Sequence, residues 1–191
     1  MSEKINLDGA SIEDVLAQLS SPNRRQRQEA ARIIAAVASL TPDQLVGHAE
    51  PLVEALENPE AQTRWEILDA LSALVALDAP SVMGATDAAE ASLFDEDSAA
   101  ARLSAFRFIA RLGATAPDAS DAAWPLLDEA IQCYHGDPEY RDMLGALLDF
   151  VRGDISDATR AALVERISFD AESGRGYVKA FSAEIVQAAQ E

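Results

Sequence analysis

The sequence has very few of the residues that build covalent or metal-bound sites. Cys133 is its only cysteine, and His48 and His135 are its only histidines, in a chain of 191 residues. A single cysteine cannot form a disulfide within the chain, and no Cys/His cluster with zinc-ligand spacing is present. Aromatic residues make up 6% of the chain and β-branched residues are sparse, which argues against an all-β fold. We therefore expect no metal or other cofactor.

Basic residues are also scarce. The chain has 15 Lys and Arg against 33 Asp and Glu, which gives a net charge of −18, and only Lys4 and Lys179 are lysines. This charge repels phosphate groups, so it disfavours general binding to nucleic acids and to anionic membranes. Two interpretations of the acidity stay open: a surface for a basic partner, or a surface that keeps the protein soluble.

Long apolar runs and a secretion signal are also not found in the sequence. We find no apolar run of 18 residues and so expect no membrane span. The segment from Met1 to Asn6 lacks the charged and apolar pattern of a secretion signal. These two expectations together predict a cytoplasmic protein.

Alanine, in contrast, is abundant, with 38 residues, and it favours closely packed helices because it combines high helix propensity with a small side chain. An internal repeat organises these helices. Apolar residues follow a recurring arginine at offsets of 3, 6, 7 and 10, with Ser182 as the one polar exception. These offsets form one face of a helix. The recurring residues, which we assign as structural repeat arginines, are Arg27, Arg64, Arg102, Arg141 and Arg175.

A shorter amphipathic segment precedes each of these helices. Ser11 followed by an acidic residue, and Thr41 followed by Pro42 and Gln44 as a capping box, are helix-start signals. The expected first helices cover residues 11–20, 43–57, 80–94, 120–134 and 156–168. Gly113, Gly153 and the step from Asp78 to Pro80 separate one helix pair from the next.

The pattern predicts a flexible N-terminal tail at residues 1–10 and one domain over residues 11–191. Five helix–turn–helix repeats would make up that domain, because one pair cannot bury its own apolar face and stacked pairs can. The expected repeat boundaries are 11–40, 41–79, 80–116, 117–153 and 154–191.

The segments that lead to Arg27 and Arg64, Ser21-Pro22 and Asn58-Pro59 followed by several polar residues, resemble the start of the second helix in HEAT repeats. The later units depart from this pattern, since the third has Asp97 in place of proline and the fifth has none. The resemblance implies an all-α fold, a right-handed α–α superhelix of about five HEAT-like helix–turn–helix repeats, with an armadillo-like arrangement also open. It further implies that the second helices line a concave, protein-binding face.

Non-core positions of those second helices define a candidate binding ridge. Equivalent positions of neighbouring repeats would lie side by side, so Arg32, Asp69 and Arg107 would form a ladder of alternating charge. Trp65 is either an interface anchor or a packing residue, and Trp124, which precedes a proline, is expected in the core. The full predicted ridge is Arg32, Trp65, Asp69, Leu103, Arg107 and Arg111.

No catalytic constellation is found in the sequence. Cys133 and His135 are two residues apart and would not face each other on a helix, so we expect a buried cysteine and a surface histidine. The acidic turn Asp95–Asp97 lacks a calcium-loop pattern. We therefore predict a non-enzymatic scaffold or adaptor that binds another protein.

Two alternatives to this function stay open. One is a DNA-alkylation glycosylase of HEAT-like architecture, which would need a basic groove. The other is an acidic surface that binds a basic, DNA-binding protein. On the final helix, outward-facing Tyr177, Phe181 and Ile185 would form a homodimer or partner surface, whereas inward-facing side chains would make that helix a cap.

Overall fold

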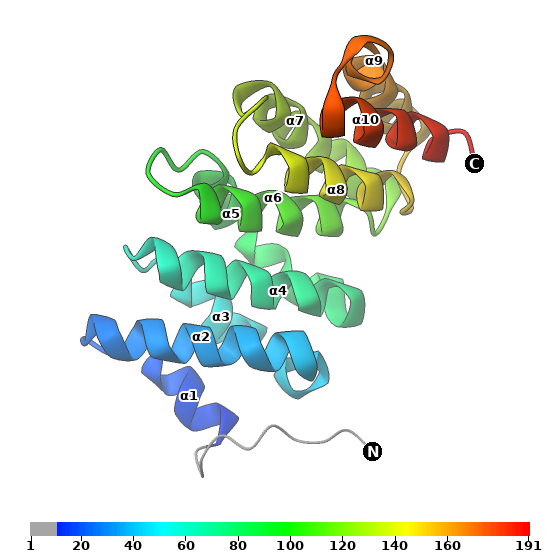
Figure 1. Ribbon diagram of the computed structural model, residues 1–191. Coiled ribbons are helices and arrows are strands. Elements are labelled where there is room, and N and C mark those ends of the chain that lie inside the picture. Colours follow the sequence, from blue (N-terminus) through cyan, green and yellow to red (C-terminus); the bar gives the residue numbers. More distant parts are fainter. Residues whose placement is uncertain (1–10) are drawn as a thin grey trace. The chain divides into compact units, whose positions relative to one another are not determined.

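The computed structural model describes residues 11–191, which are helical and contain no strand. The predicted all-α class is confirmed, and the tail predicted at residues 1–10 lies outside the described residues. The elements in chain order (Figure 1) are α1 (Ile12–Gln18), α2 (Arg24–Leu40), the 3₁₀ helix η1 (Pro42–Leu45), α3 (Ala49–Ala55), α4 (Ala61–Val82), the 3₁₀ helix η2 (Met83–Ala85), α5 (Thr86–Leu93), α6 (Ala99–Gly113), α7 (Pro117–Cys133), α8 (Tyr140–Val151), α9 (Asp157–Ser173) and α10 (Gly176–Ala188).

The chain divides into two compact units, one that ends at Phe108 and one that begins at Ile109. In the first unit α2 packs against both α1 and α4, and α3 packs against α4. In the second unit α10 packs against α8 and α9, and α7 packs against α9. The single repeat domain predicted over residues 11–191 stays a prediction.

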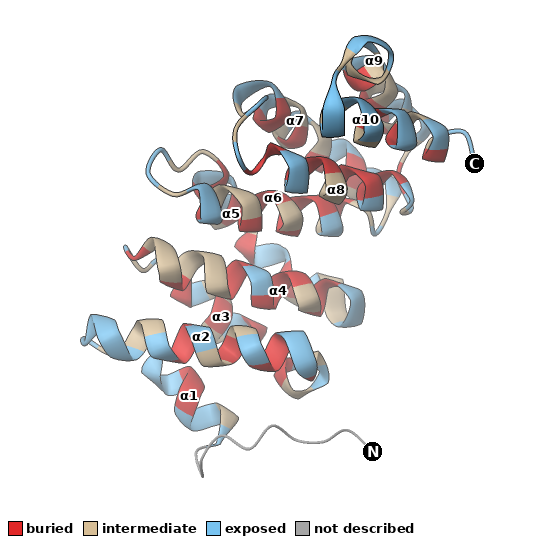
Figure 2. Ribbon diagram, viewed as in Figure 1, coloured by how far each residue is buried: buried red, intermediate tan, exposed pale blue. Residues whose placement is uncertain are grey.

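The apolar positions that follow each repeat arginine form the core of these helix pairs. Figure 2 shows buried residues recurring along α2, α4 and α8, as the 3.6-residue helical period requires. Even Ser182, the polar exception in the pattern, is buried. Buried residues at offsets 3 and 7 include Ala30, Ile34, Ile67, Leu71, Ala105, Ile109, Leu144 and Leu148.

Short polar side chains cap the first turns of α1, α2 and α9, where Ser11, Asn23 and Ser156 each accept a bond from a backbone N–H. Ser11, predicted as a helix start, forms a reciprocal capping box with Asp14, with bonds of 3.0 and 3.1 Å between each side chain and the other residue's backbone N–H. The capping box predicted at Thr41 is wrong. The Thr41 hydroxyl accepts no bond from the backbone of the helix that follows, a four-residue 3₁₀ helix; it donates a 3.4 Å bond to the Val37 carbonyl of α2 and accepts a 2.6 Å bond from the Gln44 amide.

A kink interrupts α4 at Asp78, where the backbone (φ −157°, ψ 70°) is not helical. Pro80 accounts for it, because proline supplies no N–H and clashes with the carbonyl four residues earlier. The break lies at the step that the sequence predicted as a repeat boundary.

The region around this kink is more apolar than expected. Residues Ala61–Leu93 contain an 18-residue window with mean hydropathy 1.5, which is long and apolar enough for a membrane span by composition. The expectation that no such stretch exists was wrong. The reason lies in the packing of α4, which contacts α2, α3, α5 and both 3₁₀ helices and therefore has apolar residues on several sides.

In the first unit the repeat arginines connect one helix pair to the next. Arg27 donates a 2.8 Å bond from Nη1 to the Ser21 carbonyl of its own loop, and its Nε and Nη2 both bond Glu60 at the start of α4. Arg64 repeats the arrangement: Nη1 donates to the Pro59 carbonyl at 2.9 Å, and Nη2 pairs with Asp95.

The series continues at the third arginine and then changes. Arg102 donates from Nη1 to the Asp95 carbonyl at 2.9 Å, whereas Arg141 and Arg175 are exposed. In the second unit Arg160, which is outside the predicted column, donates to the Val151 carbonyl at 2.7 Å, and Arg166 bonds Asp128. The bond from the repeat arginine to a carbonyl of its own loop is therefore a feature of the first three repeats.

Glycine permits a close contact between α6 and α7 in the second unit. A Cβ atom added at Gly113 would lie 2.6 Å from the Ala123 Cβ and 3.0 Å from Phe150, well inside van der Waals contact. At Gly145, in α8, the nearest atom would be a Phe181 ring carbon at an ordinary 3.9 Å. The two glycines thus have different roles although both are helical.

Removal of the Arg27 side chain should lower the free energy of unfolding by about 3 kcal/mol, because it leaves a buried carboxylate without its cation. The side chains of Arg27 and Glu60 are only 13% and 7% exposed. Urea denaturation of Arg27→Ala measures the loss. Arg32→Ala, which breaks the exposed pair with Glu29, is the matched control and should change stability little.

The same contact predicts a pH dependence. Hydrogen bonding from Arg27 lowers the pKa of Glu60, so this stabilisation is complete above the unfolded-state pKa of about 4.3 and is lost as pH falls through the lower folded pKa. The stability difference between the parent chain and Arg27→Ala should therefore shrink below about pH 4. A difference that stays constant down to pH 2 would contradict this assignment.

Gly113→Ala should destabilise the second unit by about 1–3 kcal/mol, because the added methyl overlaps an atom that cannot rotate away. Gly145→Ala is the comparison, and it should leave stability unchanged or raise it by up to about 1 kcal/mol through helix propensity. Thermal unfolding followed by circular dichroism compares the two. Equal shifts in melting temperature would rule out the close contact as the cause.

Candidate protein-binding face

The candidate face is on α2 and α4, two second helices that pack side by side in the first unit (Figure 1). Arg32 and Asp69 are exposed there, and Trp65 is half-buried. An intermediate burial fits either role of this side chain. Both sequence interpretations of Trp65, as interface anchor and as packing residue, therefore stay predictions.

Arg32 is held by its own helix. Its Nε and Nη2 donate bonds of 3.1 and 2.6 Å to the two Glu29 oxygens, one turn earlier on α2. This bonding, followed by the Glu66 charge on α4, raises the pKa of Arg32, whereas Arg32 lowers the pKa of Glu29. The predicted charge ladder of Arg32, Asp69 and Arg107 stays a prediction, and the carboxylates that act on Arg32 include Glu29 and Glu66.

Glu66 is the half-buried carboxyl of this face. Burial raises its pKa, and the negative charge of Asp69, one turn further along α4, raises it again. The positive charge of Arg32 and hydrogen bonding from Trp65 and Gln62 lower the pKa in part. The face therefore holds three carboxylates, Glu29, Glu66 and Asp69, together with Arg32 and Trp65.

The remaining ridge residues are on α6. Leu103 and Arg107 are half-buried and belong to the first unit, whereas Arg111 is exposed and belongs to the second. Their membership of one ridge with Trp65 stays a prediction. The structure brings together the α2 and α4 part of the ridge, through the charges of Arg32, Glu66 and Asp69.

Sequence reasoning missed Glu29, Gln62 and Glu66. Glu29 stands three residues before Arg32, and Gln62 stands four before Glu66, both spacings that place side chains on one helix face. These spacings predict that the side chains are neighbours. The ridge was instead defined by fixed offsets from the repeat arginine, and those offsets do not include Glu29, Gln62 or Glu66.

The Cys133 prediction was wrong, because this side chain at the end of α7 is exposed. His135 is exposed as expected, and its Nε2 lies 3.0 Å from Asp170 while its ring lies 4.7 Å from that of Tyr140. Burial raises the pKa of Tyr140.

Trp124, expected in the core, is half-buried. Within residues 11–191 no group of His, Cys, Asp and Glu could hold a metal ion.

On the final helix the three aromatic and aliphatic positions differ in burial. Ile185 is buried, Phe181 is half-buried near Gly145 of α8, and Tyr177 is exposed. The helix thus packs most of its apolar side inward, as an end cap does. A homodimer through this helix stays a prediction.

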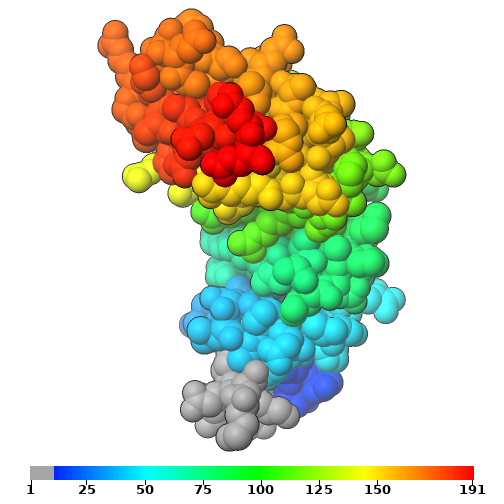
Figure 3. Space-filling view, turned by 90° about the vertical axis from the view of Figure 1, so that its right-hand side faces the viewer, coloured from blue at the N-terminus to red at the C-terminus, as the bar shows by residue number. Residues whose placement is uncertain are grey.

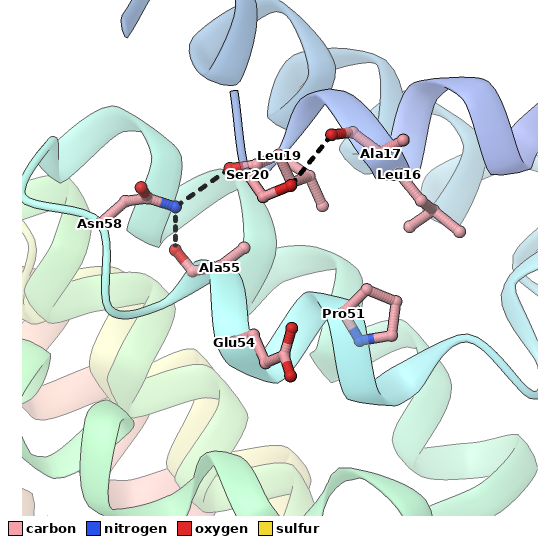
Figure 4. Close-up of a pocket in the computed structure, with 8 residues that line it drawn as sticks. All are labelled: Leu16, Ala17, Leu19, Ser20, Pro51, Glu54, Ala55 and Asn58. Carbon is pink, nitrogen blue, oxygen red and sulfur yellow. Dashed lines mark hydrogen bonds between the residues drawn. The ribbon is translucent and has the colours of Figure 1, made fainter. Parts of the chain in front are cut away.

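A cleft of about 290 Å³ lies between α1 and α3, apart from the candidate face (Figure 4). Asn58 spans it by donating bonds to the carbonyls of Leu19 (3.4 Å) and Ala55 (2.9 Å), and Ser20 bonds within its own turn. These polar groups are used in joining the two helices. No ridge residue lines the cleft.

No protein-family model and no curated protein matches this chain. Solved structures do match. One, described as a designed armadillo repeat protein in complex with the peptide (KR)4, is 15% identical with a TM-score of 0.78, covering 96% of this chain and 84% of its own.

Two further structures agree. A crystal structure of an engineered protein is 18% identical with a TM-score of 0.75, covering 94% of this chain and 79% of its own. Computationally designed armadillo repeat proteins for modular peptide recognition match at 17% identity and a TM-score of 0.71, over 93% of this chain and 82% of theirs. At such identities the likeness concerns the fold alone, and it confirms that this chain has an all-α helical-repeat fold of the armadillo and HEAT type.

Proposed function

We propose that this chain is a binding scaffold whose α2–α4 face holds a basic, extended segment of another protein. The observation that supports the proposal is half-buried Trp65 beside Glu66, with Asp69 one turn further along α4 and the pair of Arg32 and Glu29 on the adjacent α2. A lysine or arginine side chain that enters this group would relieve the repulsion between Glu66 and Asp69. The same cation could lie over the Trp65 ring, where its attraction to the ring face contributes about 0.5–2 kcal/mol.

The designed neighbours support this proposal. One of them is described in complex with a peptide of alternating lysine and arginine, and another is described as made for modular peptide recognition. Their fold, like this one, displays the exposed positions of successive helices on a preformed surface. A preformed surface lowers the ordering cost of binding, so a modest number of contacts suffices for specificity.

A glycosylase function is less well supported, because such an enzyme needs a basic groove. Of the arginines clustered at the start of α2, Arg27 is paired with Glu60 and Arg32 with Glu29. Among the solved structures that resemble the chain are an engineered protein and a designed armadillo repeat protein that is described in complex with a peptide. The protein-binding proposal therefore has the stronger support.

Trp65→Ala should weaken binding of the (KR)4 peptide about 10- to 30-fold, since buried interface tryptophans are common energetic centres. Glu66→Gln should weaken it several-fold, and added salt should weaken binding to the parent chain. Fluorescence anisotropy of a labelled peptide measures these affinities. In a Trp124→Phe background, the emission of the remaining Trp65 should change when the peptide binds.

Glu165→Gln is the matched control, because it removes an exposed charge of the second unit and should leave the affinity unchanged. Circular dichroism checks that each variant keeps its helix content. An unchanged peptide affinity in a folded Trp65→Ala variant would refute this face as the binding site.

A further inference from the structure

Four large apolar side chains of the first unit are exposed in the C-terminal parts of α2 and α4 and at the segments η1 and η2 that follow them. We name them the edge strip: Leu40 (72% exposed), Val46 (47%), Leu77 (50%) and Met83 (61%). Each is at least 47% exposed, so none contributes much to the buried interior. Apolar side chains grouped on a surface are typical of interaction sites.

The strip repeats with the register of the fold. Leu40 and Leu77 stand 13 residues after Arg27 and Arg64, and Val46 and Met83 stand 19 residues after them. Because α2 packs on α4 and η1 also contacts α4, these equivalent positions occupy neighbouring sites. At the same offsets the following repeat has Thr115 and Asp121, so the strip is confined to two repeats.

The C-terminal ends of helices α2 and α4 point the same way, to the right in Figure 1. Figure 3 faces that side and shows the segment around residue 40 below the segment around residue 80 on the same surface of the first unit. The strip is therefore reachable from one direction. It is also distinct from the Trp65 face, which belongs to the first turns of α4.

The charge around the edge strip determines which class of partner can bind there. Between residues 33 and 101 the sequence has thirteen acidic residues and a single basic one, Arg64, whose guanidinium group is paired with Asp95. Asp43 lies between Leu40 and Val46 in the sequence, and Asp78 follows Leu77. A second copy of a chain with net charge −18, or an anionic lipid surface, would be repelled here.

We propose that the edge strip binds an amphipathic helix of a partner protein, with apolar side chains on one face and lysine or arginine beside them. The apolar face would cover Leu40, Leu77 and Met83, and the flanking cations would meet Asp43, Asp78 and Asp87. Burial of apolar side chains is the main gain of such an association, so two anchors can determine whether the complex forms. This site is separate from the α2–α4 face and does not depend on it.

The test uses an 18-residue model helix of leucine and lysine with all leucines on one face, titrated into the full chain by calorimetry. Leu77→Ser combined with Met83→Ser removes apolar area without changing charge, and it should weaken binding at least about tenfold. The control, Phe169→Ser with Tyr177→Ser, removes exposed apolar side chains of the second unit and should have no effect.

Two more probes separate this site from the proposed function. The (KR)4 peptide, which lacks apolar residues, should bind the strip variant as well as it binds the parent chain. A leucine–glutamate helix should not bind either protein. Failure of the (KR)4 peptide to bind the parent chain would count against the α2–α4 face and leave the strip result standing.

The proposal is overturned if the strip variant binds the leucine–lysine helix as tightly as the parent chain does. It is also overturned if the parent chain sediments as a dimer that the strip substitutions dissociate, because the occupant would then be a second copy. Retained helix content in the strip variant makes either result interpretable, and both side chains are exposed enough for folding to survive their replacement.

Discussion

In the first unit, the arginine of one repeat bonds both its own loop and a carboxylate of the next repeat. The stacking register of the repeats depends on these contacts. Arg27 and Arg64 each bond the carbonyls of their own loop and a carboxylate that begins or precedes the next second helix. An ion pair in such a place gains little net energy over an apolar contact, because both charges lose water. Its effect is on register, since the bidentate geometry at Glu60 accepts only one position of α4 against α2.

Much of this fold could be predicted from the sequence because one helical period is repeated along the chain. The apolar offsets after Arg27 and Arg64 locate the buried faces of α2 and α4, and Pro80 locates the kink at Asp78. The site was less predictable. The pairing of Arg32 with Glu29, the exposure of Arg141 and the exposure of Cys133 depend on which neighbours approach each side chain, and offsets within one helix do not contain that information.

The same register divides the surface of the first unit into separate regions. Positions 3 and 7 after the repeat arginine form the core, positions near the first turns form the charged face around Trp65, and positions 13 and 19 form the edge strip. Because a helical repeat returns each position to the same side, a change at one offset modifies one region and leaves the others intact. Two binding surfaces can therefore coexist on a small unit.

The scarcity of basic residues around Arg64 limits where trypsin can cut this part of the chain, because trypsin cleaves after lysine and arginine. From residue 33 to residue 101 the only such position is Arg64, and its side chain is occupied by the Pro59 carbonyl and Asp95. Cleavage there requires the start of α4 to unwind and release the following loop. The rate of that single cut in the native protein thus reports how often the second and third repeats separate, without any label or substitution.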